Sequence, residues 1–128
     1  MDVEIGAVTK RLNDRNARSL LKGADVVIDT FDNSDSRGLV QRYCREAEIE
    51  CLHVGLHADY CEIIWDDQYR VPGDVAGDVC EYPLARNLVL LAVAIATETI
   101  IGFVVLGQRT SRCATLRDLA VRELERPT

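Results

Sequence analysis

Two aspartates and an asparagine follow a short apolar run, at a place where α/β proteins often build a ligand site. The run, Ala24 to Ile28, has the length of a strand, and Asp29, Asp32 and Asn33 come after it. A helical pattern then begins at about Asp35. Because ligands of open α/β sheets bind beyond the carboxyl ends of strands, these polar side chains stand at a predicted site. The alternative is helix capping, in which Asn33 accepts a hydrogen bond from a first-turn amide.

A second group has the residue types and spacing of metal ligands. Cys51, His53, His57 and Cys61 form the pattern Cys-x-His-x3-His-x3-Cys. Cys51 and His53 point to the same strand face, and a turn could bring the other two toward them as a zinc site. The competing interpretation is that the cysteines are buried strand thiols and the histidines half-exposed strand residues. On balance zinc is not expected.

The elements that position these side chains follow from hydrophobic periodicity and from helix-ending residues. A short helix is predicted over Leu12 to Gly23, and a longer one, with one apolar stripe, from about Asp35 to Glu48. The strand Glu50 to Leu56 completes a strand-helix-strand unit, so its two strands should be parallel. The strand Tyr60 to Trp65 follows after a link too short for a crossover and should pair antiparallel. The predicted sheet is therefore mixed.

The remaining segments are less regular. A short strand is predicted at Val3 to Val8, and Asp66 to Pro83 is predicted as a loop of a length that is often functional. Leu84 to Leu106 is the most apolar segment. We expect a buried helix there and not a membrane span, because Glu98 interrupts it and its flanks lack a strong basic cluster. The tail, Thr110 to Leu124, fits a helix or a strand, and an extended strand is favoured.

Composition and charge narrow the class of protein. The 128 residues are 48% hydrophobic and 28% charged, which is typical of one globular domain. A net charge of −6 argues against nucleic acid as a partner, because the chain would neutralise few phosphates. The five cysteines include no Cys-x-x-Cys pair and do not indicate a secreted disulfide framework. The first residues lack the features of a signal peptide, so a cytoplasmic location is expected.

The stretch Asp25-Val-Val-Ile-Asp-Thr-Phe-Asp-Asn33, followed by Arg37, resembles the signature of the ThiF/MoeB/ubiquitin-activating superfamily. Members of this superfamily adenylate the C-terminus of ubiquitin-like and sulfur-carrier proteins. The resemblance continues through Glu50-Cys-Leu-His-Val-Gly55 and through the apolar helix that carries Ala96-Thr-Glu98, and it matches the C-terminal half of the family's domain. It implies a single domain over residues 1–128 with a partial Rossmann-like, ThiF/MoeB-type fold, in which a mixed sheet has flanking helices in three α/β/α layers.

The resemblance also implies site residues. The second aspartate of the signature lies at the family's Mg-ATP site, so Asp32 takes that role here, with Asn33 and Arg37 as further nucleotide- or magnesium-binding candidates. Cys80 stands shortly before the apolar helix, where several members carry a thiol that joins covalently to the carrier. The competing interpretation is a small buried side chain, and three acidic neighbours disfavour the thiolate.

The family's glycine-rich nucleotide-binding half has no counterpart in this sequence. Neither Gly-x-Gly-x-x-Gly nor Gly-x4-Gly-Lys-Ser/Thr occurs, so no loop is predicted to cradle a triphosphate. Mg-ATP is the implied cofactor, but the chain is not expected to bind it without help. The signature strand should have an open edge that something must cover. We therefore expect a homo-oligomer or a separately encoded glycine-rich half as partner, with a ubiquitin-like carrier protein as substrate, and neither nucleic acid nor a membrane.

Three functions remain open. The first is a component of a ubiquitin-like or sulfur-carrier activating system, which would be an ATP-dependent adenylyltransferase. The second is a non-catalytic interaction or oligomerisation module derived from that family, in which Asp32 and Asn33 only cap a helix. The third is a fragment of a dinucleotide-binding oxidoreductase, which the missing glycine fingerprint disfavours.

Overall fold

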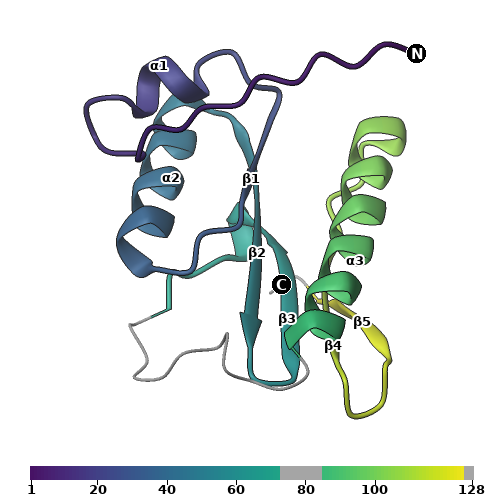
Figure 1. Ribbon diagram of the computed structural model, residues 1–128. Helices are drawn as coiled ribbons and strands as arrows, with labels where there is room; N and C mark the ends of the chain where they lie inside the picture. The colour runs from purple at the N-terminus through teal and green to yellow at the C-terminus, as the bar shows by residue number, and fades with distance from the viewer. Residues whose placement is uncertain (73–84, 126–128) are drawn as a thin grey trace.

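A five-stranded mixed sheet lies between two helical layers in the computed structural model, which describes residues 1–72 and 85–125 (Figure 1). The strands follow the order β1-β2-β3-β4-β5. They are β1 (Val26–Asp29), β2 (Glu50–His57), β3 (Tyr60–Trp65), β4 (Ser111–Thr115) and β5 (Val121–Leu124). β1 pairs parallel with β2, and every later pair is antiparallel. This confirms the predicted three-layer α/β/α fold with a mixed sheet.

The β1-α2-β2 unit closely matches its sequence pattern. α2 spans Ser34–Ala47, and its N-cap Asn33 has extended backbone and accepts a hydrogen bond from the Ser36 amide at 2.8 Å. Glu48 is the C-cap that follows the helix, and its φ of 55° is left-handed. The backbone N–H of Glu48 donates to carbonyls of the last turn. This unit places the carboxyl end of β1 beside the N-terminus of α2.

Side chains alternate between the two faces of the sheet and build a separate core on each. One core lies between α2 and the first two strands, and the other lies beneath α3 (Ala85–Leu106). The first contains Val27, Val40, Cys44 and Cys51. The second contains Leu52, Cys61, Ile63, Trp65, Leu88, Ala92, Ile95, Ala96 and Ala114. Alternate residues of β2, such as Cys51 and Leu52, therefore belong to different cores.

The expectation of a buried helix is only half right for α3. The helix packs against β2, β3 and β4, but large apolar side chains on its other face are exposed, such as Leu90 at 65% and Val104 at 69%. The segment Arg86–Leu106 is also long and apolar enough to cross a membrane, with a mean hydropathy of 2.5. Its sequence did not reveal that the sheet covers only one face.

Two predictions about the N-terminal region need correction. Val3 to Val8 is exposed and forms no strand, since no strand within residues 1–72 or 85–125 pairs with it, and an isolated strand is unstable. The first helix, α1, is confined to Ala17–Leu21. The side chain of Asn13 accepts hydrogen bonds from the amides of Arg15 and Asn16 in the turn that precedes this helix.

The C-terminal tail is extended, as favoured, but it forms a hairpin of two strands, β4 and β5. Leu119, with a φ of 56°, lies in the connecting turn. At the opposite edge of the sheet, β1 pairs only with β2 among the described residues, and Ile28 is 44% exposed. The predicted open edge at the signature strand is therefore present in the described structure.

Candidate functional site

Asp32 and Asn33 lie in the turn between β1 and α2. Both side chains are exposed, and Asn33 Nδ2 donates to Asp32 Oδ1 at 3.4 Å. Asn33 Oδ1 is used by the helix cap described above. The Ser34 hydroxyl donates to the Pro72 carbonyl at 2.7 Å, which brings the segment after β3 to the same place. The turn thus presents a carboxylate at the positive end of a 14-residue helix.

Asp29, at the end of β1, has a different role from Asp32. Its side chain is buried, and its Oδ2 lies 2.6 Å from His53 Nδ1 and 3.4 Å from Arg37 Nη1. Its Oδ1 accepts a hydrogen bond from the Phe31 amide at 3.0 Å. Arg37 also donates to the Tyr69 hydroxyl at 3.1 Å and to the Val54 carbonyl at 2.7 Å. These contacts form a buried polar network that joins β1, α2 and β2.

His53 connects this network to the segment that follows β3. Its Nε2 lies 2.9 Å from Asp66 Oδ1, so each ring nitrogen faces a carboxylate oxygen. Donation to both carboxylates requires a proton on each nitrogen. The ring also stacks on Tyr69, with a centroid separation of 3.7 Å and an interplanar angle of 10°. His53 therefore holds the segment from Asp66 to Tyr69 against the sheet by polar contacts and by stacking.

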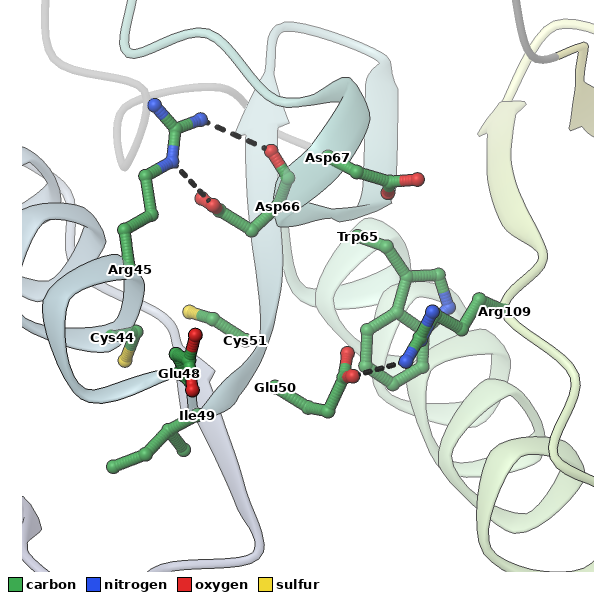
Figure 2. Close-up of a pocket in the computed structure, with 10 residues that line it drawn as sticks. All are labelled: Cys44, Arg45, Glu48, Ile49, Glu50, Cys51, Trp65, Asp66, Asp67 and Arg109. Carbon is green, nitrogen blue, oxygen red and sulfur yellow. Dashed lines mark hydrogen bonds and ion pairs between the residues drawn. The ribbon is translucent and has the colours of Figure 1, made fainter.

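Asp66 is held in its ionised form by several donors. Burial raises its pKa, but hydrogen bonds from Arg45, His53 and Gln41 outweigh burial and lower the pKa below its ordinary value. Arg45 Nε lies 2.6 Å from Asp66 Oδ2 (Figure 2), and Gln41 Nε2 lies 3.1 Å from Asp66 Oδ1. This carboxylate links α2 to the start of the 3-10 helix η1 (Asp66–Gln68).

The lowered pKa of Asp66 gives a pH dependence with a defined sign. Because the folded pKa lies below the unfolded value of about 3.9, the ionised carboxylate stabilises the fold above that pH. This contribution is lost as the pH falls through the folded pKa. We expect Asp66→Asn to be less stable than wild type at neutral pH, with a difference that shrinks in acid. Urea unfolding across pH would measure this, with the exposed Asp25→Asn as control. A pH-independent difference would contradict the role of charge.

The spatial arrangement of Cys51, His53 and Asp29 resembles a thiol-imidazole-carboxylate triad, but its environment does not suit nucleophilic catalysis. Cys51 Sγ lies 3.6 Å from His53 Nε2, the nitrogen that Asp66 also contacts. The hydrogen bond with Cys44, followed by burial, raises the pKa of the Cys51 thiol. The Cys51 side chain is buried as well. These three residues therefore do not act as a catalytic triad.

The four candidate zinc ligands do not come together. Cys51 and His53 face α2, whereas Cys61 belongs to the core under α3 and His57 is exposed at the end of β2. The reason is register: Cys61 pairs with Leu56, whose side chain points to the opposite face from Cys51. Within the described part of the chain, no group of three or more His, Cys, Asp or Glu residues is arranged to hold a metal ion.

The other predicted residues have separate positions. Arg37 is buried in the network with Asp29, apart from the exposed Asp32 and Asn33, and Cys80 lies outside the described residues. Nucleotide or magnesium binding by Asp32, Asn33 and Arg37 stays a prediction. Sequence reasoning missed the roles of Asp66 and Tyr69, because only the folding of η1 onto α2 brings them to His53.

Together these features define a partial Rossmann-like α/β domain with a polar turn at the carboxyl end of its edge strand. The family model described as the ThiF family matches residues 1–71, and the chain belongs to this family. Among curated proteins, none matches this sequence.

Solved structures of MccB from E. coli share the fold. The structure of MccB with ATP has a TM-score of 0.58 and 15% identity, and covers 92% of this chain and 41% of MccB. The structure of MccB with AMPCPP and selenomethionine MccA has a TM-score of 0.61 and 12% identity, with the same coverage of both chains. The chain thus spans less than half the length of MccB. At this identity the similarity shows the fold alone.

Proposed function

We propose that this chain is a component of an ATP-dependent adenylyltransferase of the ThiF family, to which it contributes the magnesium-binding carboxylate of Asp32. The observation that carries the proposal is the position of Asp32, exposed at the carboxyl end of β1 and at the N-terminus of α2. Ligands of α/β sheets bind at such positions. The ATP and AMPCPP complexes of MccB, which has a similar fold, are compatible with this proposal.

The residues present fit part of a Mg-ATP site. Asp32 offers the hard oxygen ligand that magnesium prefers, and the first turn of α2 favours a phosphate. The guanidinium of Arg37 is less suited to bind a phosphate, because it already donates hydrogen bonds to Asp29, Tyr69 and the Val54 carbonyl. It acts as a positioning residue that fixes the start of α2. Since the sequence has no glycine-rich phosphate loop, another component supplies it.

The open edge of β1 is the place where we propose that this component joins. A glycine-rich half that adds a strand beside β1 would cover Ile28 and place its phosphate loop near Asp32. The substrate in this proposal is the tail of a ubiquitin-like or sulfur-carrier protein. MccB has been solved with MccA, which supports a partner substrate for a protein of this fold.

Titration of the purified chain with Mg-ATP, followed by backbone amide NMR shifts, tests the role of Asp32. Without the glycine-rich component we expect no more than weak, millimolar binding, with shifts confined to the turn between β1 and α2. Asp32→Ala should weaken the binding by about tenfold or more, because a charged ligand to the metal is lost. The matched control is Asp35→Ala, which removes another exposed aspartate in the first turn of α2 and should retain binding.

A second candidate function is a non-catalytic module of the family. The Asn33 cap and the Asp29-Arg37 ion pair give the signature residues structural roles without any nucleotide. Absence of amide shifts at millimolar Mg-ATP would favour this candidate and contradict the first. No observation favours the third interpretation, a dinucleotide-binding oxidoreductase fragment.

A further inference from the structure

Two cysteines line a cavity that is remote from the turn between β1 and α2. The cavity lies at the C-terminal end of α2, whereas Asp32 precedes the N-terminal end of that helix. It has a volume of about 330 Å³, and its walls include Cys44, Cys51, Arg45 and Trp65 (Figure 2). The volume is at the low end of the range for small-molecule sites.

The tight connection between α2 and β2 brings the two cysteines together. The Ile49 amide donates to the Cys44 carbonyl at 2.8 Å, so the chain turns directly from the helix into the strand. Cys44 and Cys51 then pack in the same buried cluster beneath α2, with exposed fractions of 2% and 1%. Both residues also line the cavity.

The two thiols differ in acidity. The hydrogen bond from Cys51 lowers the pKa of Cys44, although burial and the carboxylates of Asp66 and Asp29 oppose this. The same hydrogen bond, together with burial, raises the pKa of Cys51. The Cys44 thiol is therefore the more acidic of the two, and the more acidic thiol forms the attacking thiolate more readily.

We propose that Cys44 and Cys51 are a dithiol site that reacts with a small disulfide through the cavity and closes a reversible intramolecular disulfide. In the first step the Cys44 thiolate attacks one sulfur of the small disulfide, forms a mixed disulfide and expels one thiolate. In the second, Cys51 attacks the Cys44 sulfur, and the second thiolate leaves with the Cys51 proton. In total, the protein loses two hydrogen atoms and the small disulfide is reduced to two thiols.

The other described cysteines are placed differently. Cys61 lies under α3 on the opposite face of the sheet, and burial raises the pKa of its thiol. Cys113 lies on β4. Cys113 is half-buried and can form a mixed disulfide, but disulfide closure should be confined to the Cys44-Cys51 pair in the folded protein. This inference does not rest on the proposed adenylyltransferase function.

Incubation of the folded chain with bis(2-hydroxyethyl) disulfide, followed by peptide mapping by mass spectrometry, tests the proposal. A Cys80→Ser background limits the readout to the described thiols. We expect one cross-linked peptide pair that joins Cys44 to Cys51 and disappears after reduction. Cys51→Ser should stop the reaction at a mixed disulfide on Cys44, whereas the control Cys61→Ser should leave the cross-link unchanged.

Three results would overturn the proposal. They are no reaction under native conditions, a stable mixed disulfide on wild-type Cys44 without the cross-link, and a cross-link that involves Cys61 or Cys113. Circular dichroism of each variant before the reaction shows whether it is folded, and the cross-link in the Cys80→Ser background does not depend on any substitution at Cys44 or Cys51.

Discussion

Asp29→Ala should lower the free energy of unfolding by about 3 to 5 kcal/mol, which is the usual cost of removing one partner from a buried ion pair. The substitution leaves Arg37 and His53 buried without the carboxylate that both contact at 3.4 and 2.6 Å. It also removes the acceptor of the Phe31 amide. Urea unfolding monitored by circular dichroism, with the slope compared between variants, measures the loss.

The signature stretch supplies its own matched control. Asp32→Ala also removes an aspartate carboxylate, three positions further along the chain. Because Asp32 lies in an exposed turn, this substitution should change the free energy of unfolding by less than about 0.5 kcal/mol. If Asp29→Ala does not fold, Asp29→Asn keeps the shape, removes only the charge and should still be clearly less stable than wild type. Equal stabilities of the Asp29 and Asp32 variants would show that the buried network contributes little.

The contrast between these two aspartates separates stability from ligand binding. Asp29 is buried beside Arg37 of α2 and His53 of β2 and is part of the fold, whereas the exposed Asp32 side chain accepts a hydrogen bond from its neighbour Asn33. Loss of Mg-ATP binding in Asp32→Ala without loss of stability would therefore report on the site itself. The same loss in an Asp29 variant would be explained by unfolding.

Sequence reasoning predicted the β1-α2-β2-β3 part of the fold well because the signals there are local. The apolar run ending at Asp29, the Asn33 cap and the short link before Tyr60 each act over a few residues. The buried network was not predicted, because it depends on register. His53 meets Asp29 only when β2 pairs with β1, and meets Asp66 only when η1 folds back over β2.

Register also explains why the four candidate zinc ligands lie apart. Cys-x-His-x3-His-x3-Cys places four ligand types close together in the sequence, yet the β2-β3 pairing sends Cys61 to the face opposite Cys51. The exposure of α3 was missed for another reason. An apolar sequence shows that a helix must be covered, but not whether the same chain covers it.

The exposed face of α3 leads to a prediction about assembly. Seven large apolar side chains of this helix are between 42% and 71% exposed. They are Val89, Leu90, Val93, Ile101, Val104, Val105 and Leu106. A patch of this kind is uncommon on a monomer, and a symmetric pair of helices would bury it against itself. We propose that a second copy of the chain covers this face.

Leu90→Glu combined with Val93→Glu should then convert a dimer into a monomer, because two charges would be buried at the centre of the apolar contact. Light scattering after gel filtration measures the mass, which should be twice 14.3 kDa for the wild type and 14.3 kDa for the variant. Val121→Glu is the control, since Val121 on β5 is 48% exposed but lies outside α3. A wild-type chain that is monomeric at micromolar concentration would contradict the second copy, and the apolar face would then need another partner.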